Sequence, residues 1–367
     1  MNKTIAVLGI RGVPAAHGGF ETFAERLALY LVDKGWQVTV YCHENGAGEA
    51  WEDHWNGVKR VNIPVQRSGP AGTIIFDLKS TLDARRRGIP CLTLGYNTAV
   101  FALLLRSKKI PNVINMDGIE WARAKWGPAA RIWFWMNDWL GCWLGNHLVA
   151  DHPEIAKHLQ SRVSKAKITT IPYGAQRILD SPEAPVRAMG LEPGKFLTVV
   201  ARAEPENSIL EIVQGFSRSL RGIKLVVLGN YEASHGYQRK VLHAASEEVL
   251  FPGAIYDKEI VHALRYHCLG YVHGHQVGGT NPSLVEALGA GNAVIAHDNK
   301  YNRWVAGRTS LYFNGAADFE ARLLELLGSE DLAAMMRKGS VARFEDGLKW
   351  DNVLAAYEDL LSRHQQS

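Results

Sequence analysis

The sequence predicts an α/β protein built from two doubly wound domains with parallel sheets. The chain has 367 residues, a length that suggests two domains at about 150 residues each. In both halves, short apolar runs typical of buried parallel strands alternate with amphipathic helical patterns. Apolar residues make up 47% and charged residues 21% of the chain, which is ordinary globular usage and excludes disordered and fibrous classes.

The first half opens with a strand–helix–strand unit. Residues 4–10 form a continuous apolar run that predicts a buried strand. Apolar residues at three- and four-residue spacing predict a helix over 20–31, which ends at Lys34–Gly35. Residues 38–42 predict the next strand, so the segment has the order of a βαβ unit.

The second half repeats this order, and a C-terminal helical pattern follows it. Its predicted elements are strands at 196–201, 224–228, 269–272 and 293–296, and helices at 209–220 and from about 282. The Pro-rich stretch Asp180–Pro185 lies between the halves. We therefore predict an N-terminal domain at 1–180, a C-terminal domain at 181–345, and a helix at 346–367 that can cross back to the first domain.

Charge and cysteine usage limit the class of protein. Lys and Arg number 41 against 37 Asp and Glu, a net charge of +4, which is too small for a dedicated nucleic-acid binder. Four cysteines lie far apart, which predicts reduced, buried thiols in a cytosolic protein. The start of the chain leaves no room for a signal peptide, and no run of about 18 apolar residues occurs. We expect a cytoplasmic protein that is at most peripheral on a membrane.

A glycine-rich loop at 9–19 follows the first strand. Glycines between a strand and a helix allow backbone N–H groups to approach an anion. The loop lacks both the P-loop motif and the G-x-G-x-x-G spacing, so a turn that needs glycine only for its geometry is the alternative. Glu44 follows the second strand, where a Rossmann domain has its ribose-binding acid. A nicotinamide site is therefore a further alternative.

Arg202 follows the first strand of the second half. An arginine at a strand end can hold a phosphate through two parallel hydrogen bonds. The alternative is a surface arginine paired with Glu204 or Glu206.

The segment 271–291 combines glycines, a helix start and a carboxylate. Asn281 or Thr280 can cap a helix that has Pro282 at its first position. Glu286, about one turn inside that helix, can accept hydrogen bonds from a pair of vicinal hydroxyls such as those of a ribose. The alternative is an exposed glutamate that favours the helix dipole.

Residues 279–291, GTNPSLVEALGAG, resemble the glutamate-bearing signature of glycosyltransferase family four. Residues 8–25 and 116–126 resemble a narrower subgroup, the bacterial rhamnosyltransferases of surface-polysaccharide assembly. The resemblance extends over nearly the whole chain. It implies the GT-B fold, in which two Rossmann-like domains face a central cleft, and retaining chemistry.

The resemblance also implies a nucleotide-sugar site. Arg202 would bind the diphosphate, Glu286 would bind the ribose hydroxyls, and the backbone of Ile255 would contact the base. The backbone around Gly279 to Asn281 would hold the sugar and distal phosphate. The full set of predicted binding residues is Gly18, Gly19, Arg202, Asn207, Ile255, Gly278, Gly279, Thr280, Asn281 and Glu286, and the predicted catalytic residues are Arg202, Asp117 and Glu286.

The sequence departs from the family pattern at three positions. Gly278 stands where a first glutamate is usual, and Asn207 stands where a lysine is usual. Asp117 takes the place of a histidine at the end of the fourth strand of the first domain. Stabilisation of the leaving group must therefore rely on Arg202 and on backbone amides.

No metal or cofactor is expected. The chain has no D-x-D pair, the motif through which a GT-A enzyme holds a diphosphate by way of a cation. His273 and His275 lack further ligands at metal-binding spacing and are interpreted as structural or as polar groups of the cleft. His152 and His158 are interpreted as solvated.

Six of the 11 tryptophans lie between residues 121 and 143. Arg123, Lys125 and Arg131 lie among them, a composition typical of an interfacial helix that meets anionic lipid. A helix packed in the core of the first domain is an equally good interpretation. Trp135, Trp139 and Trp143 share one face at four-residue spacing, which fits both.

These observations predict a retaining glycosyltransferase. The expected donor is a dTDP- or UDP-sugar, with L-rhamnose from dTDP-rhamnose favoured by the subgroup resemblance. The expected acceptor is a glycan or a lipid-linked saccharide at the cytoplasmic face of the membrane, and no nucleic-acid partner is expected. Two alternatives are an NDP-sugar epimerase on the same fold and a non-catalytic nucleotide-sugar- or glycan-binding protein.

Overall fold

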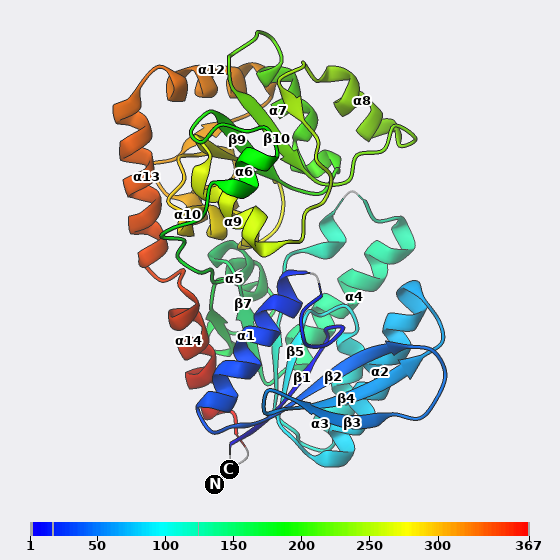
Figure 1. Ribbon diagram of the computed structural model, residues 1–367. Coiled ribbons are helices and arrows are strands. Elements are labelled where there is room, and N and C mark those ends of the chain that lie inside the picture. The colour runs from blue at the N-terminus through cyan, green and yellow to red at the C-terminus, as the bar shows by residue number, and fades with distance from the viewer. Residues whose placement is uncertain (1–2, 17, 124, 366–367) are drawn as a thin grey trace. The chain divides into compact units, whose positions relative to one another are not determined.

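The computed structural model describes residues 3–16, 18–123 and 125–365. The chain divides into two compact units (Figure 1). Unit 1 comprises Met1–Pro172 together with Asp351–Ser367, and unit 2 comprises Tyr173–Trp350.

Unit 1 contains an eight-stranded sheet with the order β3-β4-β2-β1-β5-β6-β7-β8. All neighbouring strands run parallel except β3, which is antiparallel to β4. The strands are β1 (Thr4–Leu8), β2 (Gln37–Asn45), β3 (Trp51–Trp55), β4 (Val58–Val65), β5 (Cys91–Leu94), β6 (Asn112–Asn115), β7 (His147–Ala150) and β8 (Ile168–Thr170).

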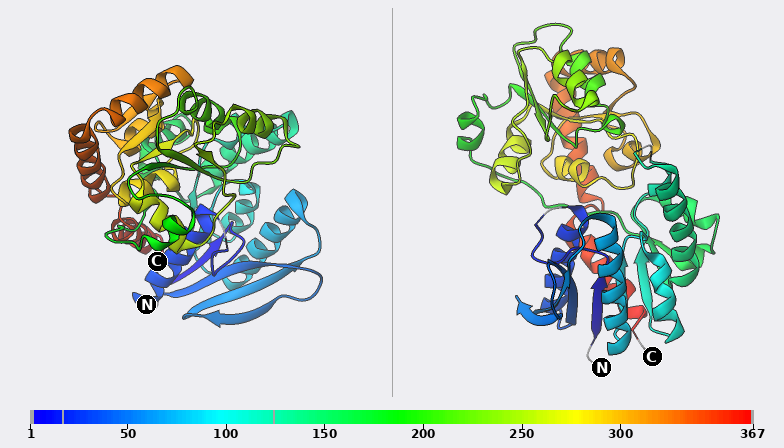
Figure 2. Two further views of the ribbon diagram at one scale, coloured as in Figure 1. Left: turned by 45° about the horizontal axis from the view of Figure 1, so that its top comes forward. Right: turned by 90° about the vertical axis from the view of Figure 1, so that its right-hand side faces the viewer.

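Helices cover both faces of this sheet (Figures 1 and 2). They are α1 (Gly19–Asp33), α2 (Gly69–Arg87), α3 (Ala102–Ser107), α4 (Pro128–Leu144), α5 (Pro153–Gln160) and α14 (Trp350–Arg363). On one side of β1 the chain adds β2, β4 and β3, and on the other side it adds β5, β6, β7 and β8. Right-handed crossovers therefore place α1 and α3 on opposite faces.

Asn115 on β6 fixes the C-terminal helix to unit 1. Its Nδ2 donates a buried hydrogen bond of 2.8 Å to the hydroxyl of Tyr357 on α14. The Tyr357 ring also contacts Phe23 of α1, with ring centroids 4.6 Å apart. Glu358 accepts hydrogen bonds from Tyr30 and Trp36. The last helix thus packs beside the first one.

Unit 2 contains a six-stranded, fully parallel sheet with the order β11-β10-β9-β12-β13-β14. The strands are β9 (Phe196–Val200), β10 (Lys224–Leu228), β11 (Val249–Leu250), β12 (Gly270–His273), β13 (Val294–His297) and β14 (Leu311–Phe313). The helices are α6 (Ala184–Ala188), α7 (Ile209–Phe216), α8 (Gly236–Ala244), α9 (Lys258–His267), α10 (Pro282–Gly289), α11 (Lys300–Ala306), α12 (Ala316–Leu327) and α13 (Glu330–Glu345).

The strands of unit 2 are buried on both faces. Leu197 and Val199 pack in one apolar cluster with α7 and α12, while Phe196 packs in a second cluster with α6 and α9. Successive side chains of a strand point to opposite faces. This two-sided burial explains why the strands appear in the sequence as continuous apolar runs.

The division between the units lies earlier than the predicted boundary at residue 180. The Pro-rich stretch Asp180–Pro185 lies within unit 2, because α6 begins there and places the fully buried Val186 against α9. At the observed division, the backbone of Ala175 exchanges hydrogen bonds with Leu348 and Trp350.

Most predicted elements are present with shifted ends. The helix predicted over 209–220 ends at Phe216, because the Arg221 side chain donates to the carbonyls of Phe216 and Gly215 and satisfies the end of the helix. The β3–β4 hairpin was not predicted. Asp117 consequently follows the sixth strand in chain order instead of the fourth. All four cysteines are free and buried, as predicted.

The tryptophan-rich segment forms the short turn at 120–122 and helix α4. None of its six tryptophans is fully buried, and Trp135 and Trp143 are exposed. The buried residues of α4 are instead Asn137, Asp138, Gly141 and Cys142. The other four tryptophans, Trp121, Trp126, Trp133 and Trp139, are half-buried, so the segment is neither wholly in the core nor wholly exposed. No helix in the described part of the chain is long and apolar enough to cross a membrane.

We predict that Tyr357→Phe destabilises the protein. The change removes the acceptor of Asn115 Nδ2, and a buried donor left without a partner costs about 1–3 kcal/mol. Urea unfolding should show a lower free energy of unfolding for this variant. Tyr256→Phe, a change at an exposed tyrosine, is the control and should leave stability unchanged. Equal stability of Tyr357→Phe and wild type would contradict the prediction.

Candidate functional site

The candidate site lies where the strand order of unit 2 reverses. From β9 the chain proceeds to β10 and β11 on one side, then returns to add β12, β13 and β14 on the other. Open α/β sheets bind ligands outside the carboxyl ends of strands at such a switch point. Here two loops leave the neighbouring strands β9 and β12. They are the 201–208 loop and the 274–281 loop.

The two loops touch each other through their backbones. A Cβ on Gly274 would lie 2.0 Å from the carbonyl oxygen of Asn207, so only glycine fits. The Gln276 N–H donates to the carbonyl of Glu206 at 2.9 Å, and its side chain donates to Ser208 Oγ at 2.9 Å. These contacts hold the loops in one arrangement.

Arg202 lies in the first of these loops, and its side chain is exposed. Within the described residues it forms no ion pair, so the pairing with Glu204 or Glu206 is not observed. Its carbonyl accepts a 2.8 Å hydrogen bond from Asn207 Nδ2. Asn207 is itself buried, so its amide shapes the loop from which Arg202 extends.

The second loop leads into α10. Asn281 is the N-cap residue, and its Oδ1 accepts hydrogen bonds from the Ser283 N–H at 3.1 Å and from Ser283 Oγ at 2.8 Å. Pro282 is the first helical residue. Of the two predicted capping residues, Asn281 therefore makes the cap. Thr280 is buried. Gly278 and Gly279 precede Thr280 in the same loop.

Glu286 on α10 forms an ion pair that the sequence did not predict. Its Oε2 lies 2.5 Å from Arg265 Nη2 of α9. The Arg265 side chain is 6% exposed and that of Glu286 is 35% exposed. A carboxylate has about four acceptor positions, so Glu286 keeps acceptor capacity on its exposed side. The Arg265 carbonyl accepts from Asn292 Nδ2 at 2.6 Å, which anchors the backbone of the arginine.

His273 and His275 lie near the site, at the end of β12 and just after it. His273 is fully buried at the end of β12, and its ring stacks on His275 with centroids 4.4 Å apart. Burial and the neighbouring His275 hold the pKa of His273 well below its ordinary value, which keeps the ring neutral. No group of three or more His, Cys, Asp or Glu in the described residues is arranged to hold a metal ion.

Two histidines of unit 1 were assigned wrongly. His152 is fully buried and caps α5, where its ring accepts from the Glu154 N–H. His158 lies 3.0 Å from the buried carboxylate of Asp138. Both were expected to be solvated. His152 is buried by its contact with the start of α5, and His158 is half-buried beside Asp138 of α4. No local pattern reveals either contact.

Ile255 lies in the loop that follows β11. Its side chain packs on the cluster formed by α6, α9 and β10. The neighbouring Ala254 N–H donates to Asn230 Oδ1 at 3.1 Å, so the loop is joined to the one after β10. The backbone of Ile255 therefore sits at the same carboxyl edge of the sheet as Arg202.

In unit 1 the glycine loop lies at that sheet's own switch point, between β1 and β5. A Cβ on Gly9 would lie 2.2 Å from the carbonyl oxygen of Leu94. The Arg11 and Ala15 N–H groups donate to carboxylates of Glu21 and Glu25 on α1. Those amides already have anionic partners, which favours a geometric role for this part of the loop. Gly18 and Gly19 follow at the start of α1.

Asp117 follows β6 in a left-handed backbone conformation, with φ 51°. Its N–H donates to Asn115 Oδ1 at 2.9 Å, so Asn115 holds both this turn and α14. Burial, and after it the charge of Glu120, raises the pKa of Asp117 to about 6. Asp117 therefore takes up its proton at a higher pH than an ordinary aspartate.

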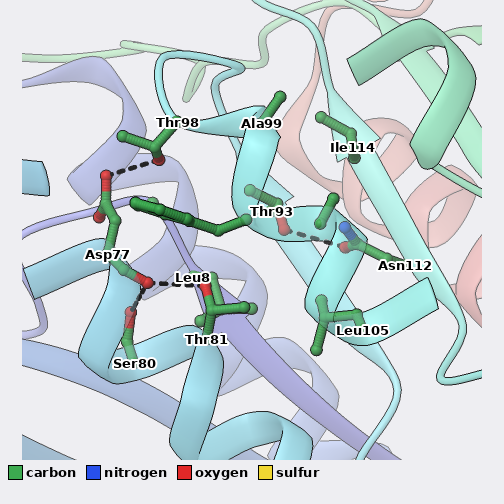
Figure 3. Close-up of a pocket in the computed structure, with 13 residues that line it drawn as sticks. Leu8, Asp77, Ser80, Thr81, Thr93, Thr98, Ala99, Leu105, Asn112 and Ile114 are labelled. Carbon is green, nitrogen blue, oxygen red and sulfur yellow. Dashed lines mark hydrogen bonds between the residues drawn. The ribbon is translucent and has the colours of Figure 1, made fainter. Parts of the chain in front are cut away.

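Unit 1 has a small cavity whose lining includes Leu8 and Gly9, at the start of the glycine loop (Figure 3). Polar groups from α2, β5 and β6 line it. Asp77 accepts a 2.8 Å bond from Thr98, and Thr93 donates to Asn112 Oδ1 at 2.9 Å. Its volume of about 20 Å³ accommodates about one water molecule, so it cannot hold a sugar nucleotide.

Comparison with known proteins establishes the fold. A family model described as a domain of unknown function (DUF1972) matches residues 2–176, and no curated protein matches. The structure is similar to that of sucrose-phosphate synthase from Thermosynechococcus elongatus, with a TM-score of 0.81 and 17% identity over 99% of both chains.

Two further structures are similar over their whole length. HepE from Anabaena, solved in complex with UDP, has a TM-score of 0.75 at 12% identity, with 98% of this chain and 100% of that chain covered. A glycosyltransferase from Rickettsia africae has a TM-score of 0.73 at 12% identity, with 99% and 98% covered. The chain therefore has the GT-B fold, which confirms the predicted fold class.

We predict that Asp117→Asn changes how stability depends on pH. The pKa of Asp117 is raised to about 6 in the folded protein, above its ordinary value near 4. The folded state therefore takes up the proton first as pH falls, and this group adds stability between about pH 7 and pH 4. The variant lacks this gain.

Denaturant unfolding at pH 7.5 and pH 5 measures the effect. The stability of wild type relative to Asp117→Asn should rise at the lower pH. Burial also raises the pKa of Asp77 to about 6. Because Asp77 is present in both proteins, its contribution to the difference in stability cancels. A constant difference between the two proteins would show that Asp117 is not perturbed.

Proposed function

We propose that this protein is a glycosyltransferase that transfers a sugar from a nucleoside diphosphate donor to a saccharide acceptor. One observation carries the proposal: the neighbouring strands β9 and β12 at the switch point of unit 2 lead into an exposed arginine and into a glycine-rich helix start followed by a half-exposed glutamate. These are Arg202, residues 278–281 and Glu286. The similar HepE structure is in complex with UDP, which supports the same class of donor.

The proposed chemistry is cleavage of the bond between the anomeric carbon and the diphosphate oxygen. An acceptor hydroxyl forms the new bond to that carbon on the face that the diphosphate leaves. The nucleoside diphosphate departs with the bonding electrons, and the hydroxyl proton passes to its leaving oxygen. Negative charge grows on the departing diphosphate. Donors fixed in advance stabilise such charge most effectively. In this proposal, those donors are Arg202 and the N–H groups at the start of α10. The configuration at the anomeric carbon is retained, as in the family that the sequence resembles.

The donor and acceptor follow from the resemblance. A dTDP-sugar, with L-rhamnose favoured, or a UDP-sugar is the proposed donor, and Glu286 and the Ile255 backbone are the proposed contacts to the nucleoside. The proposed acceptor is a glycan or lipid-linked saccharide on the cytoplasmic side of a membrane. Gly18, Gly19 and Asp117 are the proposed contribution of unit 1, and no cofactor takes part.

An NDP-sugar epimerase is the second candidate, since it would use the same donor contacts. A non-catalytic nucleotide-sugar-binding protein is the third. Incubation with donor alone separates these functions, because only the epimerase turns over without an acceptor. Product that contains the acceptor supports the transferase.

A thermal-shift panel of dTDP, UDP, GDP and NAD tests the proposed site. A ligand at 100 times its dissociation constant stabilises the folded state by about 2.7 kcal/mol. We expect dTDP or UDP to raise the melting temperature. In Arg202→Ala the shift should shrink, and turnover should fall further than donor affinity because the charge that Arg202 meets grows during bond cleavage.

Arg187→Ala is the matched control. Arg187 is an exposed arginine of the same unit, paired on the surface with Glu183, and its removal should leave binding and turnover unchanged. A response to NAD alone would contradict a glycosyltransferase. Equal shifts for wild type and Arg202→Ala would remove Arg202 from the site.

A further inference from the structure

Helix α4 of unit 1 has the reverse of the usual amphipathic arrangement. Its exposed large side chains are Ile132 at 67%, Trp135 at 49%, Met136 at 38% and Trp143 at 53% exposure. Helical spacing places these residues on one stripe, here called the α4 stripe. The opposite face buries the polar Asn137 and Asp138. A helix bordered by water normally buries its apolar face and exposes its polar face.

The buried polar residues fix this orientation. Asp138 Oδ2 accepts hydrogen bonds from Trp121 Nε1 at 2.7 Å and His158 Nε2 at 3.0 Å, and it pairs with Arg162. Asn137 Oδ1 accepts from the Val100 N–H at 2.9 Å. A rotation of the helix would leave these groups buried without partners, at considerable cost. The α4 stripe is therefore held outward.

Cations flank the stripe at both ends. Arg106 and Lys167 donate to carbonyls at the C-terminal end of α4, including that of Trp143. Arg131 and Lys125 are exposed at the N-terminal end. Asp138 is the one carboxylate between residues 121 and 150, and it is buried. The stripe itself is thus apolar and aromatic, and these four cations border its ends. Glu120, just before the segment, contacts Arg123 and Trp126.

We propose that the α4 stripe docks on the surface of an anionic phospholipid bilayer, with α4 parallel to the membrane plane. Tryptophans with basic neighbours favour the headgroup level, where aromatic rings and cations both find suitable partners. At 17 residues, α4 is about 25 Å long and its stripe is suited to lie in the interface. This inference is independent of the proposed transferase activity.

Co-sedimentation with vesicles tests the docking. The full-length protein should pellet with vesicles of phosphatidylcholine and phosphatidylglycerol in a ratio of two to one, and much less with phosphatidylcholine alone. Added salt should weaken the binding. Trp135→Ser combined with Trp143→Ser should reduce partitioning roughly tenfold or more, because two large apolar side chains no longer enter the bilayer.

Trp51→Ser is the matched control, since Trp51 is a tryptophan of unit 1 with similar exposure, 47%, away from α4. It should bind vesicles like wild type. Equal binding to neutral and anionic vesicles, or undiminished binding of the double variant, would overturn the proposal. Light scattering supplies a further check: a wild-type dimer that the double variant converts to a monomer would assign the stripe to a second copy of the chain and overturn membrane docking.

We also infer that Arg265 is a positioning residue for Glu286. Arg265 is buried, its Nη2 contacts Glu286 Oε2, and its Nε has no hydrogen-bond partner. Such an imperfectly satisfied buried arginine adds little net stability. Its contact does restrict one oxygen of the carboxylate and directs the remaining acceptor positions outward. This inference rests on the proposed function, because it gives Glu286 the hydroxyls of a nucleoside as its ligand.

Ligands that lack ring hydroxyls test this role. Calorimetry would compare UDP with 2′,3′-dideoxy-UDP, and dTDP with 3′-deoxy-dTDP. Wild type should prefer the hydroxylated member by about tenfold or more, the loss expected for a hydrogen bond to a charged group. Arg265→Met and Glu286→Gln should both remove most of that preference, and Arg265→Lys should keep part of it.

Arg221→Met is the matched control. Arg221 is another buried arginine of unit 2, with a side-chain exposure of 3%, paired with a carboxylate, Glu320. Its loss should lower stability and leave the hydroxyl preference intact. If Glu286→Gln removes the preference while Arg265→Met retains it, the positioning role fails and the proposed site remains. If wild type binds none of the four ligands, the proposed function itself fails.

Discussion

The contact between two loops at the β9–β12 switch point is the constraint on which the candidate site depends. The carbonyl of Asn207 occupies the space that any side chain at position 274 would need. Hydrogen bonds from Gln276 to Glu206 and Ser208 then join the loops. Because both loops continue directly from buried strands, Arg202 and the start of α10 are positioned by the sheet itself.

Buried polar side chains fix the helices around this frame. Asn115 in unit 1 joins β6 to both α14 and the Asp117 turn, and Asp138 sets the rotation of α4. Arg265 in unit 2 joins α9 to α10. Each of these groups would be costly without its partners. They therefore determine which face of each helix is left for a ligand or a surface.

The sequence predicts the strands well and the tertiary contacts poorly. Two-sided burial makes each parallel strand a continuous apolar run, so β1, β9 and β10 are recognisable without a structure. The glycines at 9–19 and 278–279 likewise mark the two switch-point loops. The Arg265–Glu286 pair is not recognisable, because it joins residues 21 positions apart on two helices. Asp138 and His158 are similar: their contact depends on how α4 and α5 pack, and a local pattern favours solvated side chains.

Two of the departures from the pattern of the family that the sequence resembles have a physical explanation. At position 207 the structure has a buried asparagine whose amide holds the Arg202 carbonyl. A lysine there would place a charge at a buried position, which is unfavourable unless the charge is paired. The usual first glutamate is replaced by Gly278, beside the capped start of α10, which removes a negative charge from the region proposed for the distal phosphate. The loop thus has fewer charges of both signs, and in the proposed reaction its electrostatics depend on one exposed arginine and on fixed backbone amides.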